Sequence, residues 1–143
     1  MTSKTDLDGV KVTEKVSIPA FILRDRSVAV LESITEYLKD EKGLTYHEIA
    51  VLLNRDDRTI WTVYNRAKKK RDKTPVKKEV YKKKLVIPAK IFRDRNVSVL
   101  EATAEYLKKE GMTYHEIAEA LNRDDRTIWT VCYRAKKKRE NEQ

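Results

Sequence analysis

The stretch Thr45-Tyr-His-Glu-Ile-Ala50, followed two residues later by Leu53-Asn-Arg-Asp-Asp-Arg-Thr-Ile-Trp-Thr-Val63, decides the fold because it occurs twice. The same residues stand at 113–118 and 121–131. Working outward, residues 16–71 align with 85–139 across a one-residue gap near Lys42, and 40 of the 55 aligned pairs are identical. Such repetition indicates two units of one fold, so the 143 residues are expected to form two small domains.

Each unit is expected to begin with a helix, at about residues 27–41 and 97–110, in which apolar residues recur at helical spacing. In the second unit Ser98 and Glu101 form a capping box. The first unit has alanine at the matching position, so Ser27 is the expected cap there. The glycines that follow are expected to end these helices: Gly43 and Gly111.

The repeated stretch itself predicts two further helices joined by a tight turn. Thr45 and Glu48 form a capping box at the start of the second helix, and residues 113–116 repeat it. Asn54 ends that helix, because asparagine tolerates the left-handed conformation of a tight turn. Asp56 then caps a third helix, which is expected to end near Lys70. The second unit has the same asparagine and aspartate, at Asn122 and Asp124.

Charge is concentrated near the ends of the two units. The formal net charge is +9, and both repeats end in Arg-Ala-Lys-Lys-Lys-Arg, at 66–71 and 134–139. The segment 72–84 between them carries six lysines against two carboxylates and is expected to set the distance between the units. This pattern favours a polyanionic partner, either nucleic acid or an anionic membrane surface, over a merely solvated face.

The residues of the repeat also resemble a known family. The segments 44–50, 53–60 and 65–70 look like region 4 of bacterial sigma factors, and Arg58-Thr-Ile60 is similar to LuxR-type regulators. The resemblance covers well under half of the chain. It implies a helix-turn-helix in which the second helix crosses the DNA backbone and the third enters the major groove. Arg55 and its counterpart Arg123 depart from the pattern, because that turn position is usually apolar.

The expected fold class is therefore all-α, with two tandem three-helix helix-turn-helix domains, each preceded by a short apolar extended arm. The arms, 16–23 and 85–92, each contain a proline, which argues against a long helix. They either pack over their own helices or form an interface between the two domains or, by self-association, between two chains. The expected boundaries are 1–15 for a flexible N-terminus, 16–71 for domain one, 72–84 for the basic linker, 85–139 for domain two and 140–143 for the tail.

Helical geometry sorts the candidate DNA contacts into three groups. Base reading is expected from the third-helix residues opposite the apolar face, since arginine suits guanine and asparagine suits adenine: Arg58, Thr62, Asn65, Arg126, Thr130 and Tyr133. Phosphate binding is expected from the second-helix starts and the basic runs: Thr45, Tyr46, Arg66, Lys68, Lys69, Lys70, Arg71, Thr113, Tyr114, Arg134, Lys136, Lys137, Lys138 and Arg139. Four residues are candidates for the flank of the interface: Arg55, Trp61, Arg123 and Trp129.

The leading hypothesis is a double-stranded DNA-binding transcriptional regulator that reads two similar half-sites, which differ because Asn65 in one unit corresponds to Tyr133 in the other. The alternatives are an architectural or chromatin protein that coats DNA with little specificity, and an interaction module that docks on RNA polymerase. The sequence has no catalytic triad, carboxylate pair or metal-ligand cluster, so we expect no enzyme, metal or cofactor. It has no membrane-length apolar run, and its single Cys132 forms no intramolecular disulfide. The expected location is cytoplasmic, on the nucleoid.

Overall fold

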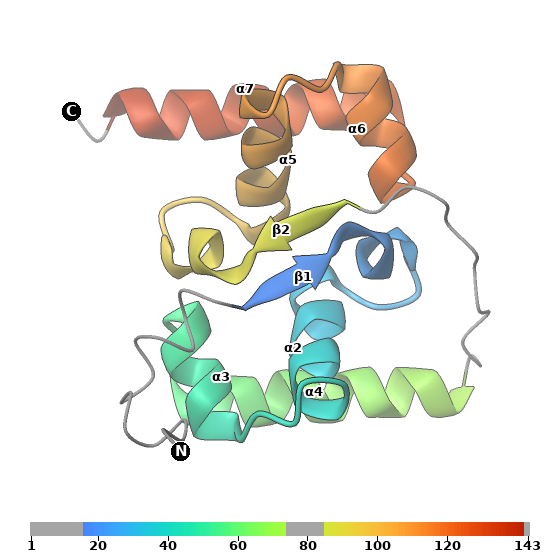
Figure 1. Ribbon diagram of the computed structural model, residues 1–143, viewed down its shortest axis with the longest axis vertical. Helices are drawn as coiled ribbons and strands as arrows, with labels where there is room; N and C mark the ends of the chain where they lie inside the picture. The colour runs from blue at the N-terminus through green and yellow to red at the C-terminus, as the bar shows by residue number, and fades with distance from the viewer. Residues whose placement is uncertain (1–15, 74–84, 142–143) are drawn as a thin grey trace.

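Two short strands from distant parts of the chain meet at the centre of the computed structural model, which describes residues 16–73 and 85–141. Strand β1 (Ser17–Pro19) pairs antiparallel with strand β2 (Val86–Pro88), as Figure 1 shows. The expectations for 1–15 and for most of 72–84 fall outside the described residues.

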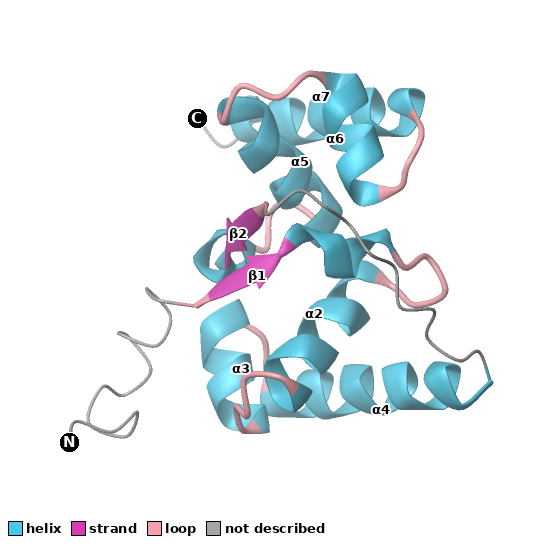
Figure 2. Cartoon of the chain, turned by 45° about the vertical axis from the view of Figure 1, so that its right-hand side comes forward, coloured by secondary structure: helices cyan, strands magenta, loops and turns pink. Residues whose placement is uncertain are grey.

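Helices make up most of the described chain, consistent with the expected all-α class, but only three residues of each arm are extended and the rest of it enters a 3-10 helix (Figure 2). Each strand leads into a short 3-10 helix and then into three α-helices. In the first repeat these are η2 (Ala20–Arg24), α2 (Val30–Asp40), α3 (Tyr46–Leu53) and α4 (Asp57–Lys73). In the second they are η3 (Ala89–Arg93), α5 (Val99–Lys109), α6 (Tyr114–Leu121) and α7 (Asp125–Asn141). Both third helices run past their expected ends, α4 by three residues and α7 to Asn141.

The predicted caps and turn residues of the second helix of each repeat are confirmed. Thr45 accepts a hydrogen bond from the Glu48 N–H, and its repeat Thr113 does the same for Glu116. The turn residue Asn54 has φ 56° and Asn122 has the same value, so both occupy the left-handed region. The helices therefore end and begin where local chemistry places them.

One cap prediction is wrong. The residue that precedes α2 is Ala29, whose N–H donates to the Glu32 carboxylate. Ser27 instead hydrogen-bonds the Asp25 carboxylate through both its backbone N–H and its hydroxyl. In the first repeat the capping box is incomplete, because only the Glu32 side chain accepts a hydrogen bond. In the second repeat it is complete, because Glu101 accepts from the Ser98 N–H and the Ser98 hydroxyl accepts from the Glu101 N–H.

The strand register relates the two repeats by a local twofold axis. Ile18 lies opposite Ile87, its own counterpart in the repeat, and both side chains are fully buried. The backbone hydrogen bonds beyond the strands are reciprocal, from the Ala20 N–H to the Leu85 carbonyl at 2.8 Å and from the Ala89 N–H to the Val16 carbonyl at 3.0 Å. Contacts in which each half contributes the same residues are the mark of a twofold interface.

The hydrophobic core is continuous across both repeats. Each 3-10 helix packs on the first long helix of its own repeat and also on the other repeat, η2 against α6 and η3 against α3. The arms therefore form the interface between the two repeats within one chain, in addition to covering their own helices. Small domains bury too little surface for a large stability margin, so a shared core benefits both halves.

Two arginines at the tight turns join the repeats. Arg55 Nη1 donates to the Leu53 carbonyl at 2.6 Å and to the Phe92 carbonyl of the other repeat at 3.2 Å. Arg123 repeats this with the Leu121 carbonyl at 2.7 Å and the Leu23 carbonyl at 3.2 Å. The guanidinium at a usually apolar turn position therefore satisfies carbonyl groups on both sides of the interface.

We expect Arg123→Ala to lower the free energy of unfolding by about 1.5–3 kcal/mol, because it removes hydrogen bonds from a charged donor to half-buried carbonyls. Urea unfolding followed by circular dichroism measures this. The control is Arg126→Ala, which removes an exposed arginine from α7 and should change stability by less than about 0.5 kcal/mol. Equal unfolding midpoints for the two variants would contradict the role of Arg123.

Candidate nucleic-acid interface

The side of α4 that faces away from the core carries four polar side chains. Ile60, Val63 and Ala67 are buried on the inner side. On the outer side Arg58 and Lys69 are exposed, and Thr62 and Asn65 are half-buried. We call these four residues the outer face of α4. The corresponding outer face of α7 consists of Arg126, Thr130, Tyr133 and Lys137.

The two tryptophans lie beside these outer faces with much of their surface exposed, 54% for Trp61 and 52% for Trp129. The Trp129 ring stacks on Tyr133 with centroids 5.3 Å apart. In the first repeat Asn65 Nδ2 instead donates to the Trp61 carbonyl at 2.7 Å. About half of each tryptophan side chain is therefore accessible beside these outer faces.

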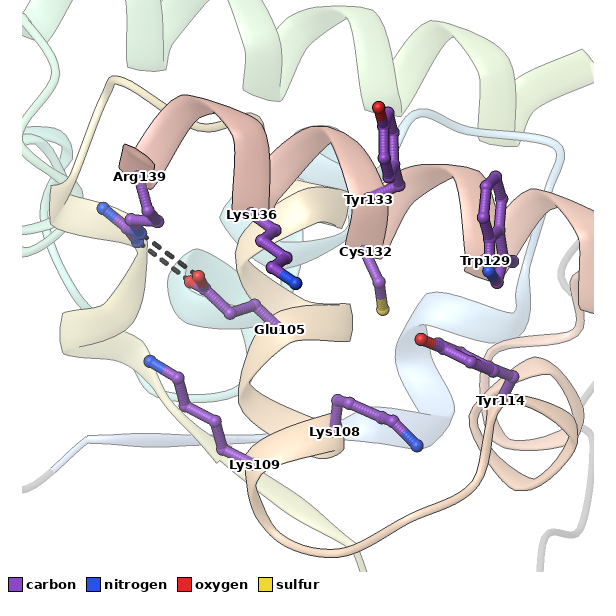
Figure 3. Close-up of a pocket in the computed structure, with 9 residues that line it drawn as sticks. All are labelled: Glu105, Lys108, Lys109, Tyr114, Trp129, Cys132, Tyr133, Lys136 and Arg139. Atoms are coloured by element: carbon purple, nitrogen blue, oxygen red, sulfur yellow. Dashed lines mark hydrogen bonds and ion pairs between the residues drawn. The ribbon is translucent and has the colours of Figure 1, made fainter. Parts of the chain in front are cut away.

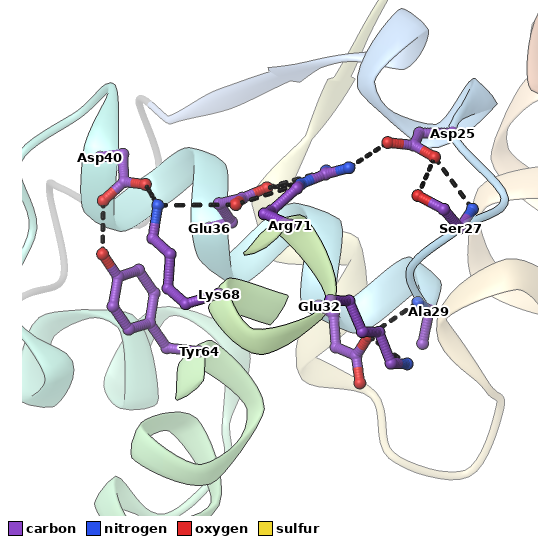
Figure 4. Close-up of polar contacts among 10 residues, drawn as sticks. Asp25, Ser27, Ala29, Glu32, Glu36, Asp40, Tyr64, Lys68 and Arg71 are labelled. Atoms are coloured by element: carbon purple, nitrogen blue, oxygen red, sulfur yellow. Dashed lines mark hydrogen bonds and ion pairs between the residues drawn. The ribbon is translucent and has the colours of Figure 1, made fainter. Parts of the chain in front are cut away.

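Much of the basic run at the end of α4 is engaged within its own repeat (Figure 4). Lys70 pairs with Glu32 at 2.8 Å, and Arg71 pairs with Glu36 at 2.9 Å. Lys68 contacts Asp40 and lies 3.6 Å from Glu36. The second repeat has the equivalent pairs of Lys138 with Glu101 and of Arg139 with Glu105. These expected phosphate contacts therefore hold α4 and α7 against α2 and α5.

Two of the acidic partners, Glu32 and Asp40, have pKa values below their ordinary ones. Burial raises the pKa of Glu32, but hydrogen bonds from Lys70 and the Ala29 N–H outweigh it, so the pKa lies below its ordinary value. Burial likewise raises the pKa of Asp40, and hydrogen bonds from Lys68 and Tyr64 reverse the shift. A carboxylate whose pKa is lower in the folded state than in the unfolded state stabilises the fold at neutral pH. This stabilisation is lost as the pH falls through the pKa of the folded state.

The remaining cations of the run stay exposed. Arg66 and Lys69 of α4 and Arg134 and Lys136 of α7 are open to solvent. Lys137 is also exposed, and its contacts are within its own helix, 3.8 Å to the Glu140 carboxylate and 5.5 Å to the centroid of the Tyr133 ring. These five are the exposed cations of the expected phosphate-binding set that have no ion pair with α2 or α5 in the described residues.

The threonines that cap α3 and α6 are both exposed, but the tyrosines that follow them differ in exposure. Thr45 and Thr113 are exposed. Tyr46 is half-buried and its ring packs edge-on against Tyr64 at 5.8 Å. Tyr114 is exposed, since Cys132 replaces that second ring in the other repeat. The two expected tyrosine contacts are therefore not equivalent.

Two exposed arginines next to the tight turns were missed by the sequence interpretation. Hydrogen bonds from Thr59 are the main reason that the pKa of Asp56 is lowered, and the positive charge of Arg95 adds to the effect. Arg26 acts in the same way on Asp124. Each arginine thus lies near the start of the other repeat's third helix. The only sequence signal was the repeated Arg-Asp-Arg after each arm, and nothing local indicates that it crosses between repeats.

Each third helix begins with a histidine–aspartate pair. His47 Nδ1 lies 3.1 Å from a carboxylate oxygen of Asp57, and His115 Nδ1 lies 3.1 Å from Asp125. A hydrogen bond to Asp125 is the main cause of a raised pKa at His115, and the nearby charge of Glu119 adds to it. Val51 stands in place of Glu119 in the first repeat, so the two pairs carry different local charge.

The two long helices lie on the same side of the central strands. In Figure 1, α2 passes in front of α4 and α5 passes in front of α7. When the molecule is rotated into the view of Figure 2, α4 and α7 shift toward the same side of the picture relative to β1 and β2. Both helices therefore lie on the same side of the strands. The twofold axis through the strands therefore presents α4 and α7 to a common side, one at each end of the molecule.

The described residues contain no cluster of histidine, cysteine, aspartate or glutamate that could hold a metal ion. Among them there is also no helix both long and apolar enough to cross a membrane. Cys132 is half-buried, and burial raises the pKa of its thiol. That shift keeps the sulfur in its protonated, less nucleophilic form.

We expect the pKa of His115 in the folded chain to lie above 6.5. The charged imidazole therefore stabilises the fold below pH 6.5, and this stabilisation is lost as the pH rises through the pKa of the folded state. Asp125→Asn should bring the pKa back toward 6.5, and Glu119→Val should lower it less. An NMR titration of the imidazole carbon-bound protons measures all three. A His115 pKa at or below 6.5 in the unchanged chain would contradict the pairing.

The comparisons with known proteins add no relative to this description. No family model, curated protein or solved structure matches the chain. The features of the molecule that bear on function are the outer faces of α4 and α7 and the paired strands that fix their relation.

Proposed function

We propose that the chain is a double-stranded DNA-binding protein whose two tandem helix-turn-helix units read two similar half-sites in the major groove. The observation that carries this proposal is the pair of exposed polar faces on α4 and α7, related by the twofold pairing of β1 with β2. A transcriptional regulator is the role that two such half-site readers fit best.

The local geometry matches the requirements of the motif. A tight turn at Asn54, with its φ of 56°, separates α3 from α4 and directs the outer face of α4 away from the core. In the proposed arrangement α4 lies in the major groove and Arg58 and Asn65 approach base edges. The α3 start at Thr45 lies near the phosphate backbone, because helix N-termini attract anions.

We expect the phosphate contacts to come from the exposed cations that form no ion pair with α2 or α5 in the described part of the chain. We assign them to Arg66 and Lys69 on α4 and to Arg134 and Lys137 on α7, all of which are exposed. The arginines that reach the neighbouring turn, Arg26 and Arg95, extend this set. Three expected contacts in the first repeat (Lys68, Lys70 and Arg71) instead serve the ion pairs with α2.

The twofold relation favours an inverted repeat over a direct one. Antiparallel strands place identical units in opposite orientations, and the same holds for the half-sites that they read. The strand pair, together with Arg55 and Arg123, also holds the units in one relation regardless of the basic segment between them. Tyr133 in place of Asn65 makes the two half-sites similar rather than identical.

Selection of preferred duplexes from a random pool should return an imperfect inverted repeat, with its half-site centres about one helical turn, ~34–36 Å, apart. Inserting base pairs one at a time between the half-sites should reduce affinity sharply, because the strands leave the units no freedom to follow. Direct repeats, or affinity indifferent to spacing, would contradict the proposal. A specificity ratio near one would indicate an architectural protein instead of a regulator, and ~10³ or more a regulator. Retention of RNA polymerase without DNA binding would favour the docking module.

The two classes of contact are separable by substitution. Arg58→Ala should cost about 1–3 kcal/mol on the selected duplex and relax preference at one base pair in one half-site. Arg126→Ala should do the same in the other half-site. Lys69→Ala should weaken all sequences alike and reduce the slope of log K against log salt by about 1. An Arg58→Ala variant with unchanged affinity and preference would show that α4 is wrongly oriented here.

A further inference from the structure

The second repeat contains a surface pocket of about 540 Å³ beside α7 (Figure 3). It lies where α5, α6 and α7 meet, and its volume is in the range of ~300–1,000 Å³ that small-molecule sites occupy. Residues from all three helices line it, among them Lys108 and Lys109 of α5, Tyr114 of α6, and Trp129 and Tyr133 of α7. Of the four residues on the outer face of α7, Tyr133 alone is among those that line the pocket, and no lining residue comes from α4.

The corresponding place in the first repeat is filled. Tyr64 occupies the position of Cys132, and its ring packs against Tyr46. The Tyr64 hydroxyl donates to Asp40 at 2.7 Å, and Lys68 closes the group by contacting the same carboxylate. A phenol, an acid and a lysine thus satisfy one another at the site.

Three substitutions between the repeats undo this arrangement together. Cys132 replaces the tyrosine and removes the ring that fills the space. Lys109 stands where the first repeat has Asp40, so the acid that holds Lys68 there is absent. Tyr133 replaces Asn65 and adds a ring that stacks on Trp129 with an interplanar angle of 8°. The combined effect converts a closed polar cluster into an open pocket with aromatic walls.

The lining is strongly cationic. Lys108, Lys109, Lys136 and Arg139 contribute positive charge, against one carboxylate, Glu105. Arg139 already pairs with that carboxylate at 2.9 Å. Neither Lys109 nor Lys136 has an ion-pair partner in the described part of the chain, whereas the Lys136 counterpart Lys68 does. An anion in the pocket would therefore meet unpaired ammonium groups.

The walls are suited to a flat ring. Tyr114, Trp129 and Tyr133 are three of the six large apolar side chains that stay exposed in the described residues. Lys108 Nζ sits 4.3 Å from the centroid of the Tyr114 ring. Figure 3 shows the Cys132 sulfur directed from α7 toward the part of the pocket that holds Tyr114. Aromatic side chains gain stacking energy with a planar ligand beyond the area that they bury.

We propose that this pocket binds a small anion that carries a flat aromatic ring, such as an aromatic carboxylate or a nucleoside monophosphate. The ring lies against Tyr114, Trp129 and Tyr133, and the anionic group lies against Lys109 and Lys136. This site goes beyond the proposed DNA-binding function. It is tested without DNA, so either proposal can fail while the other stands.

The experiment is an NMR titration of the full chain with benzoate and, separately, with adenosine monophosphate. The two indole N–H signals report the two repeats, because the chain has only two tryptophans, Trp61 and Trp129. Trp61→Phe assigns them. We expect a saturable shift of the Trp129 signal with at least one anion and little change at Trp61. Saturation with one probe alone identifies whether the ring-bearing anion is a carboxylate or a nucleotide.

Each anion has a neutral analogue as its control. If adenosine monophosphate saturates the site, neutral adenosine should bind at least tenfold more weakly. If benzoate saturates it, benzyl alcohol should bind at least tenfold more weakly. Inorganic phosphate, which has no ring, should leave the Trp129 signal in place. Equal shifts of the Trp61 and Trp129 signals would overturn the proposal, as would the absence of saturation with both ring-bearing anions.

The matched variant is Cys132→Tyr combined with Lys109→Asp, which rebuilds the arrangement that the first repeat already folds with. It should weaken binding at least tenfold. Lys136→Gln keeps the pocket open and should weaken the anions but not their neutral analogues. Unchanged affinity of the anions in both variants would overturn the proposal.

Discussion

The antiparallel pairing of β1 with β2 is the contact on which the arrangement of the whole molecule depends. The pairing takes three residues from each arm, and at its centre Ile18 meets Ile87 at the twofold axis with both side chains fully buried. An isolated two-stranded ribbon is marginal in water, so the pair needs its surroundings. Those surroundings are η2 and η3, each of which packs on the other repeat, and the two turn arginines that bond carbonyls across the interface. A ribbon, a shared core and two guanidinium contacts thus hold two units that are individually small.

What could be predicted from the sequence is what is encoded locally. The capping residues Thr45 and Asp56 and the left-handed turn at Asn54 lie within a few residues of the groups that they satisfy, and all three were predicted correctly. Arg55 shows the opposite case. It was expected at the flank of a DNA interface, but one of the carbonyls to which it donates, that of Phe92, lies 37 residues away in the sequence. Hydrogen bonds between the repeats have no periodic or capping signature, so neither they nor the pairing of the arms could be derived from one repeat alone.

The charged residues of the candidate site also show how little of the tertiary structure can be derived from sequence order alone. Counting residues assigns a continuous basic run to 66–71. In space the run is divided by helical geometry, since Lys70 and Arg71 face α2 and meet Glu32 and Glu36, whereas Arg66 and Lys69 face solvent. Surface ion pairs contribute little, but Glu32 is buried and also accepts the Ala29 N–H, so its pair with Lys70 connects two helix ends. The basic run is therefore split, with Lys68, Lys70 and Arg71 in ion pairs with α2 and with Arg66 and Lys69 exposed to solvent.

The twofold frame explains why the two repeats can differ where they do. Three residue pairs of the interface between the repeats are the same in both halves: Arg55 and Arg123, Asn54 and Asn122, Ile18 and Ile87. Leu23 and Phe92, which also lie at this interface, differ in side chain, but the turn arginines bond only their backbone carbonyls. The contacts of the three identical pairs are reciprocal, so a change in one half would disturb the fit of the other. Beside α4 and α7 no such reciprocity applies, because each of these sites is contained within its own repeat. Tyr64 with Asp40 in one half and Cys132 with Lys109 in the other are both compatible with the same backbone. Symmetric assembly within one chain thus leaves each half free to acquire separate chemistry, which two identical chains sharing a single sequence could not do.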